Sequence, residues 1–324
     1  MSSNGNTLKR DTAPWHEGER ALQAMAGMRE RMEGLGRAVL RDFMPDQHRA
    51  FFTERNQVFL ALMASGGQPW ATVIEGEVGF VTSATSRSLE IAATLPSRDP
   101  AAEAFQDGVP VGALGLEFDT RRRNRVNGLV RRLPDGTGFA IDVMQSFGNC
   151  PQFIQARRQA SRPLSLNDPS PEHAQWSTSL SAGDSEFIRQ CDTFFIASRS
   201  RFPGSGRSEG LDMSHRGGPP GFVTVQDNGR LTFPDYRGNF FFNTLGNLQA
   251  DPRCGILFFD FATGATLQLA GRAALSHKSD ADWQWPGVER VVSVDIDAVV
   301  RSEGRSRYHW KFLSHAPQFA AKVA

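Results

Sequence analysis

The chain contains the same strand–turn–strand pattern twice, and this repeat limits the available folds more than any other feature. Residues 112–128 and 255–271 share their glycine spacing, and each places an acidic residue beside a phenylalanine before a turn. A matching short strand precedes each copy at nearly the same distance, at 89–91 and 231–233. Self-similarity of this kind indicates tandem units of one fold. We therefore expect two homologous β-barrels in one chain, which would imitate a dimer of barrels.

Length and local composition predict the boundaries of these units. At 324 residues the chain exceeds a typical single core. Apolar residues recur at three- and four-residue intervals over 17–41, which predicts an amphipathic helix, and a second helix is expected at 46–54. The organisation we expect is an N-terminal helical segment at 1–45, a first barrel repeat at 46–156, a polar linker at 157–184 and a second repeat at 185–324.

Composition and charge narrow the classes of partner. The net charge is +1 and no large basic region is present, which argues against nucleic acid as a partner. The apolar runs are too short to span a membrane, and the first residues lack the apolar core of an export signal. With only three cysteines, a disulfide scaffold and a zinc cluster are both unsupported. These features favour a cytoplasmic protein without a metal site.

The cysteines themselves are interpreted in two ways. Cys191 and Cys254 lie in or beside apparent strands, which favours buried packing. Cys150 follows a polar run at the start of a helix that we expect to end near Gln159, and a thiolate could be stabilised there. Packing remains the commoner role for such a residue.

The two copies differ in their turns. The second copy has a long glycine- and arginine-containing insertion at 201–218 and a Pro-Asp-Tyr-Arg-Gly-Asn turn at 234–239, where the first copy has only the bland turn 92–97. Arginines and backbone N–H groups at strand ends can present hydrogen-bond donors to an anion such as a phosphate. The second copy is therefore the one expected to bind phosphate. The first copy instead has four arginines within 121–125.

The motifs of the second copy resemble those of a known family. Ser-His-Arg-Gly-Gly-Pro-Pro-Gly-Phe-Val at 214–223, the turn at 234–239 and Leu-Gly-Asn at 245–247 are similar to the pyridoxamine 5'-phosphate oxidase-like flavoproteins. The resemblance is strongest over 185–275 and weaker over 40–160. It implies a mainly β, α+β fold of tandem split β-barrels that bind FMN.

The resemblance also implies a set of site residues. The expected cofactor-binding residues are Ser214, Arg216, Gly217, Pro234, Asp235, Tyr236, Arg237, Asn239, Thr244, Asn247, Gln145, Ser146 and Asn149. His215 and Tyr236 are the catalytic candidates, because either could pass a proton. Candidates for substrate binding or a second wall are Arg121, Arg123, Arg125 and Cys150. Turn formation, helix capping and an exposed hairpin tip remain alternative explanations for several of them.

The function implied by the resemblance is an FMN-dependent oxidoreductase. It would act on a small organic substrate and exchange electrons with oxygen or with reduced nicotinamide, NADH or NADPH. The alternatives are a non-catalytic flavin-binding carrier or sensor and a haem-handling split-barrel protein. The expected partners are the small-molecule substrate and a second copy of the chain in a homodimer, with no nucleic acid and no membrane.

Overall fold

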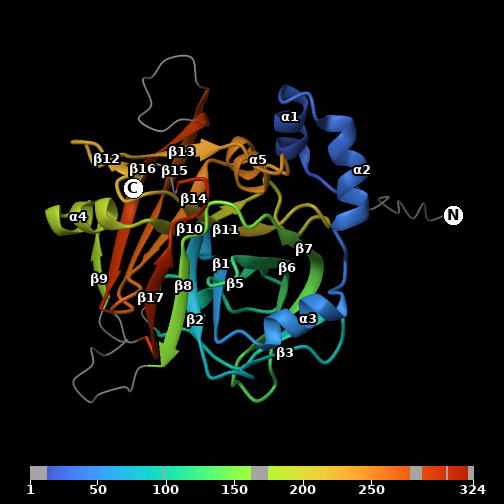
Figure 1. The fold of residues 1–324 in the computed structure, drawn as a ribbon. Helices are drawn as coiled ribbons and strands as arrows, with labels where there is room; N and C mark the ends of the chain where they lie inside the picture. Colours follow the sequence, from blue (N-terminus) through green and yellow to red (C-terminus); the bar gives the residue numbers. More distant parts are fainter. Residues whose placement is uncertain (1–12, 98, 162–173, 278–286, 304–305, 320–324) are drawn as a thin grey trace, which may run out of the picture.

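The computed structural model describes residues 13–97, 99–161, 174–277, 287–303 and 306–319. Two antiparallel β-barrels lie side by side, and helices flank them (Figure 1). The fold is thus mainly β with flanking helices, a tandem of split barrels. The strands of the first barrel are β1 (Gln57–Met63), β2 (Pro69–Glu75), β3 (Val81–Thr82), β4 (Ser88–Ile91), β5 (Pro110–Glu117), β6 (Arg122–Arg132) and β7 (Phe139–Asn149). Those of the second are β10 (Thr193–Arg199), β11 (Leu211–Gly217), β12 (Thr224–Val225), β13 (Leu231–Tyr236), β14 (Arg253–Phe259), β15 (Thr266–His277) and β16 (Val288–Ser302).

The strand order of the two sheets is the same. It runs β2-β1-β5-β6-β7-β4-β3 in the first sheet and β11-β10-β14-β15-β16-β13-β12 in the second, so each strand corresponds to the one nine places later. Even the irregularities match, since a register shift occurs at Asn127/Gly128 in one sheet and at Ala270/Gly271 in the other. A Cβ at either of these glycines would lie within 2.3 Å of a carbonyl oxygen on the neighbouring strand. Glycine is therefore required at both bulges.

The barrels pack against each other through equivalent surfaces. A Cβ on Gly112 would lie 2.6 Å from the Leu211 oxygen, and a Cβ on Gly255 would lie 2.6 Å from the Pro69 oxygen. Between them the rings of Phe59 and Phe195 stack with centroids 3.6 Å apart. The repeated glycines of the sequence thus allow the close contact of the two barrels, and the interface between them is a buried apolar core.

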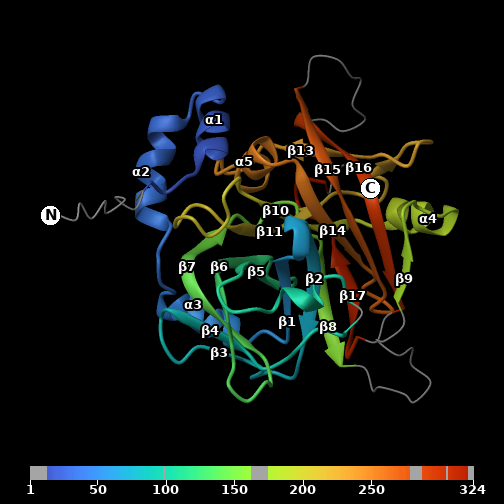
Figure 2. The ribbon, with the colours of Figure 1, turned by 180° about the vertical axis from the view of Figure 1, so that it is seen from behind.

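The N-terminal segment forms two helices where the sequence predicts one. α1 (Glu17–Met25) and α2 (Arg29–Val39) are separated at Gly27, whose φ of 68° ends the first helix. The next helix, α3 (Asp46–Thr53), lies where the sequence predicts it. Figure 2 shows α1 and α2 at the side of the molecule, with α1 next to α5 (Asn243–Ala250).

The described residues between the barrels form strands and a helix that their composition does not predict. No helix begins at Cys150; instead β8 (Ala156–Ser161) pairs with β17 (Tyr308–Ser314), and β9 (Ala174–Ser177) adds to the edge of β16. The helix α4 (Ala182–Gln190) then leads into the second barrel. Strand pairing with segments more than a hundred residues away explains why local composition failed here. Short 3-10 turns occur at Ser65–Gly67 and Ala102–Ala104.

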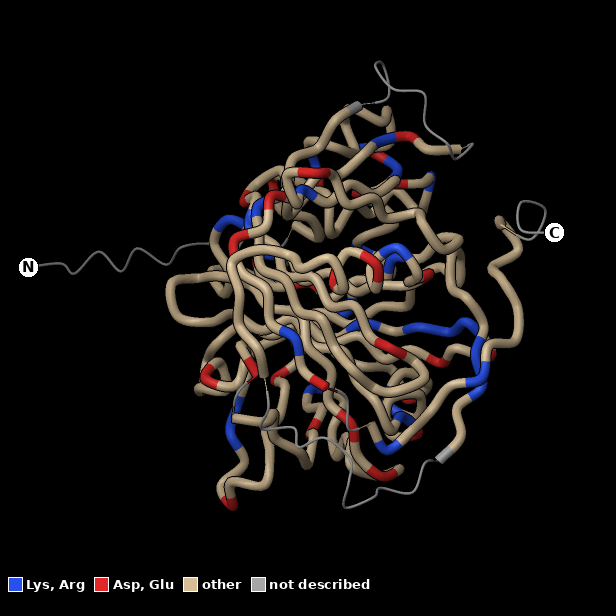
Figure 3. Tube along the Cα trace, turned by 90° about the vertical axis from the view of Figure 1, so that its left-hand side faces the viewer, with Lys and Arg blue, Asp and Glu red and all other residues tan. Residues whose placement is uncertain are grey.

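The surface carries charges of both signs. Figure 3 shows Lys and Arg interspersed with Asp and Glu along the trace. The two kinds of charge nearly balance, with a net charge of +1. No helix of the described residues is long and apolar enough to cross a membrane.

Candidate functional site

A pocket lies between the two barrels, and both contribute side chains to its walls. The first barrel supplies the start of β6, the last residue of β7 and the segment 150–153 that follows it, while the second supplies β11, β13, the first turn of α5 and the start of β16. The pocket contains about 930 Å³ of empty space including its open mouth.

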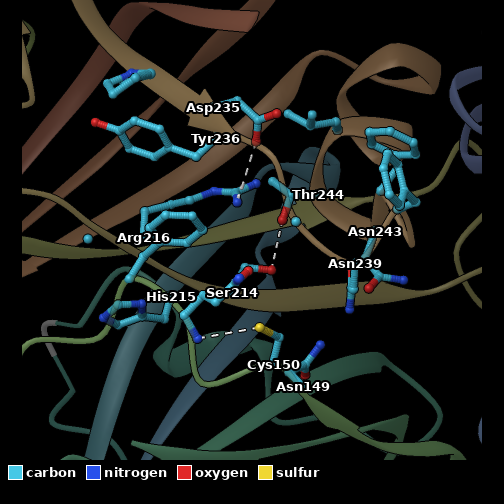
Figure 4. A pocket seen from close by; sticks show the side chains of 18 of the residues that line it. Asn149, Cys150, Ser214, His215, Arg216, Asp235, Tyr236, Asn239, Asn243 and Thr244 are labelled. Carbon is cyan, nitrogen blue, oxygen red and sulfur yellow. Dashed lines mark hydrogen bonds and ion pairs between the residues drawn. The ribbon is translucent and has the colours of Figure 1, made fainter. Parts of the chain in front are cut away.

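One wall is fixed by a buried polar network that joins the barrels. Arg125 of β6 donates to Asp212 Oδ1 at 2.8 Å and to Ser214 Oγ at 2.7 Å, both on β11. Thr244 Oγ1 donates to the same Ser214 oxygen at 2.7 Å (Figure 4). Asn247 donates to Asp212 Oδ2 at 2.8 Å. Because these groups are buried and bonded to one another, they hold β11 and α5 in place.

A second group of charges surrounds Asp235 on β13. Arg216 Nη1 lies 3.6 Å from Asp235 Oδ1, and Arg290 of β16 donates to Asp235 Oδ2 at 3.0 Å and to Glu289 at 3.1 Å. Burial raises the pKa of Asp235, while the two guanidinium groups oppose that rise. Figure 4 shows the Arg216 side chain extending across the pocket toward Asp235. The carboxylate therefore orients two arginines beside the cavity.

Arg123 differs from the other arginines of the pocket. Its Nε donates to the Cys150 carbonyl at 2.8 Å, but it forms no ion pair with any residue that the structure describes. Burial, and then the charge of Arg125, lower the pKa of Arg123 to about 9, so the guanidinium still carries its charge at neutral pH. A desolvated cation without a carboxylate partner favours a bound anion.

Two titratable side chains in the pocket have unused hydrogen-bonding atoms. His215 is buried, and neither ring nitrogen has a partner among the described residues. Burial, followed by the charges of Arg123, Arg157 and Arg216, lowers the pKa of His215 well below its usual value, so the ring is neutral at pH 7. The Tyr236 hydroxyl also lacks a partner within the described part of the chain, and burial raises its pKa. Tyr236 stacks on Phe153 at 5.1 Å.

The structure brings most of the predicted site residues together. Lining the pocket are Ser214, His215, Arg216, Gly217, Pro234, Asp235, Tyr236, Asn239, Thr244, Asn149, Arg123, Arg125 and Cys150. Strand pairing and the packing of the barrels explain how residues from 123–150 and 214–244 share one site.

Five predicted residues do not line the pocket. The Arg237 side chain is 73% exposed, and its Nε lies 4.0 Å from Glu289 Oε1. Arg121 instead donates to the carbonyls of Ile154 and His315. The remaining three serve buried contacts elsewhere: Asn247 bonds Asp212, Gln145 accepts from Asn127 at the limit of hydrogen-bonding distance, and Ser146 bonds His48.

Several lining residues were missed from the sequence. Arg290 lies outside every motif, and it joins the site only because the β13–β16 register places it opposite Asp235. Phe153 and Asn243 are also part of the wall. No local signal distinguishes them, since each enters through a long-range contact. In the described part of the chain no group of three or more His, Cys, Asp or Glu residues is arranged to hold a metal.

Comparison with known proteins gives one family match. A family model described as Pyridoxamine 5'-phosphate oxidase matches residues 184–308, which cover the second barrel. A search among curated proteins found no match.

Similar solved structures were also found, each covering about two fifths of this chain. They include Group A Streptococcus HupZ (11% identity, 39% of this chain and 99% of that chain, TM-score 0.29). Another is a Clostridium acetobutylicum protein related to general stress protein 26, of the pyridoxinephosphate oxidase family (7% identity, 40% and 92%, TM-score 0.28). A third is an FAD binding protein from Mycobacterium smegmatis (12% identity, 39% and 98%, TM-score 0.26).

Proposed function

We propose, from the premise that the second barrel belongs to the pyridoxamine 5'-phosphate oxidase-like family, that this chain binds one FMN in the pocket between its barrels. The observation that carries the proposal is the convergence of Arg123, Arg216 and Arg290 on one cavity. Both walls come from the same chain, so the proposed site is complete without a homodimer.

The donor set fits a flavin mononucleotide. A phosphate dianion requires several converging cations, and Arg123, Arg216 and Arg290 would hold it. The isoalloxazine ring carries both donors and acceptors, which suits the unpartnered His215 nitrogens and the Tyr236 hydroxyl. FMN is favoured over FAD because the sequence contains no separate dinucleotide fingerprint.

We further propose an oxidoreductase that acts on a small organic substrate with oxygen, NADH or NADPH as the electron partner. The flavin supplies the hydride and electron transfer when bound. This chain's own residues bind and orient it and manage protons. Because His215 is neutral, one ring nitrogen can accept a proton from a bound group, and the Tyr236 hydroxyl keeps its proton and can donate a hydrogen bond.

The test begins with the colour of the purified full-length protein. We expect a flavin spectrum, release of FMN on heating, and a stoichiometry of about one flavin per chain when apoprotein is titrated. Recovery of FAD alone, or failure to bind added FMN, would contradict the proposal. A Soret band would instead support the haem-handling alternative, in which the neutral His215 ring is the candidate ligand.

Turnover decides between an enzyme and a binder. Bound flavin should be reduced by NADH or NADPH, or should reduce oxygen after photoreduction, at a rate above that of free FMN. Stoichiometric FMN without any such turnover would support a carrier or sensor.

A further inference from the structure

The pocket wall formed by residues 238–245 has an unusual backbone. Phe240 and Phe242 have φ values of 62° and 61°, in the left-handed region that side chains other than glycine rarely adopt. Both line the pocket, and Phe242 is the residue from which α5 begins. Strained conformations of this kind persist only where their surroundings hold them.

Besides the contacts from the barrels, this wall is held by contacts from the N-terminal segment, which lies outside both barrels. The Trp15 ring packs on Phe241 with centroids 5.0 Å apart, and Gln23 Nε2 donates to the Phe241 carbonyl at 3.3 Å. Asn243, which lines the pocket, donates from Nδ2 to Glu19 Oε1 at 2.7 Å. Contacts from α1 and its N-terminal turn therefore fix both Phe241, which lies between the two strained phenylalanines, and Asn243, the first residue of α5.

Two glycines let α1 approach α5 at backbone distance. A Cβ on Gly18 would lie 2.0 Å from the Gly246 carbonyl oxygen, and a Cβ on Gly246 would lie 2.6 Å from the Glu19 nitrogen. Figure 1 shows α1 directly beside α5 at this crossing. Any side chain at either position would force the helices apart.

Glu19 is buried at the centre of this contact. Only 4% of the residue is exposed, and Oε2 accepts from the His16 backbone nitrogen at 3.0 Å while Oε1 accepts from Asn243. One carboxylate oxygen thus completes the capping box of α1 with His16, while the other orients the Asn243 side chain. Through Asn243 the carboxyl group connects α1 to the pocket.

We propose that residues 13–25 are a brace that holds the wall 238–245 in its binding conformation, with Glu19 as a positioning residue acting through Asn243. The brace rests on the proposed flavin site. The N-terminal helix lies outside the residues that match the family model. In this proposal it nevertheless helps to determine the affinity for flavin.

The first experiment compares two glycine substitutions in the full-length protein. Gly18→Ala places a methyl group against the Gly246 oxygen, whereas the matched control Gly34→Ala on α2 meets nothing within 4 Å. We expect Gly18→Ala to weaken FMN binding about tenfold or more, as loss of a buried hydrogen bond to a charged group does, and to change the visible circular dichroism of bound FMN. Gly34→Ala should bind FMN as the wild type does.

The second experiment tests Glu19 without disturbing the helix crossing. Glu19→Ala should weaken FMN binding, and Glu19→Gln should restore most of the affinity and the visible circular dichroism, because its amide oxygen can still accept from Asn243. Far-UV circular dichroism should show folded barrels in all variants. If Gly18→Ala fails to fold, the Glu19 pair decides the question.

The outcomes separate the brace from the flavin site itself. If the wild type binds no FMN, the proposed function fails. If the wild type binds FMN and folded Glu19→Ala binds it equally well with an unchanged spectrum, the brace is wrong and the flavin site stands. Equal loss in Glu19→Ala and Glu19→Gln would also contradict the role assigned to the Asn243 hydrogen bond.

Discussion

At the place where the second barrel has Arg216, the first barrel has Ile74. The equivalence follows from the strand registers. In the first barrel Gly112 pairs with Ala61, which pairs in turn with Ala71. In the second barrel Gly255 pairs with Ala197, which pairs in turn with Met213. Counting three residues on from Ala71 and Met213 leads to Ile74 and Arg216. By the same strand registers, Thr72 is equivalent to Ser214, and Gln268 is equivalent to Arg125. The same strand topology therefore creates an equivalent position in each barrel, and the two positions carry different side chains.

At the equivalent position in the first barrel, the polar side chains are hydrogen-bonded to one another. Thr72 Oγ1 donates to Asp99 Oδ2 at 2.6 Å, and Gln268 Nε2 donates to the same oxygen at 3.3 Å and to the Ala71 carbonyl at 3.1 Å. Ile74 belongs to the apolar core of the first barrel. Polar atoms there bond one another, whereas in the second barrel His215 and Tyr236 keep unpartnered atoms. The difference shows that unpaired hydrogen-bonding atoms and charged groups, and not the strand topology, distinguish a candidate site.

The largest effect is expected when the first barrel receives the arginine of the second, in the variant Ile74→Arg. Ile74 is 4% exposed, so Ile74→Arg would bury an unpaired charge in the apolar core. We expect the free energy of unfolding to fall by about 3–5 kcal/mol, without gain of a second flavin. Urea denaturation and FMN stoichiometry measure both effects. Two flavins per chain in this variant would show that the difference between the barrels lies elsewhere.

The reverse exchange should remove binding and spare the fold. Arg216→Ile gives the second barrel the residue of the first, and it removes a cation that is 26% exposed at the pocket. A hydrogen bond to a charged group contributes about 1.5–3 kcal/mol, so FMN affinity should fall roughly tenfold or more. Thermal stability should also fall, because buried Asp235 then keeps only Arg290 as a guanidinium partner. Arg122→Ala, outside the pocket, is the matched control. Unchanged affinity in Arg216→Ile would remove this residue from the site.

A third exchange concerns pH. Val73 of the first barrel corresponds to His215, whose pKa in the folded protein is lowered well below 6.5. The unfolded chain binds a proton below pH 6.5 and the folded protein does not, so stability is lost as the pH falls through that value. Between pH 7.5 and 5.5 this residue should lower the free energy of unfolding by on the order of 1 kcal/mol.

His215→Val should abolish that part of the pH dependence. The measurement is chemical denaturation of wild type and variant at both pH values. His16 and His48 contribute equally to both proteins and cancel in the difference. An identical pH dependence in the two proteins would mean that the pKa of His215 is the same in the folded and unfolded states.

The smallest effect is expected at Arg237. Its side chain is 73% exposed, lies 4.0 Å from Glu289 and stacks over Phe240 at 5.3 Å. Exposed pairs of this kind contribute at most about 1 kcal/mol and often nothing measurable, so Arg237→Ala should change FMN affinity less than about twofold. Fluorescence titration beside Arg216→Ile provides the comparison. A tenfold loss would return Arg237 to the site.

The sequence alone determined the repeat and the likeness of the second copy to a family. Glycines recur at equal spacing because each bulge and each barrel contact excludes a Cβ, and this requirement is visible along the chain. The segments 214–217 and 234–239 also show a polar, anion-binding character in their residue types alone. Local patterns suffice where one backbone position dictates one residue type.

Only the tertiary structure decided which of the candidates share a pocket. Arg237 and Asn239 lie two residues apart, yet the Arg237 side chain is 73% exposed while Asn239 lines the cavity. Arg290 enters through strand register, Phe153 through the packing of one barrel on the other, and Glu19 through a helix crossing that bridges more than two hundred residues. Such long-range contacts depend on how whole elements pack, which no local run of residues specifies.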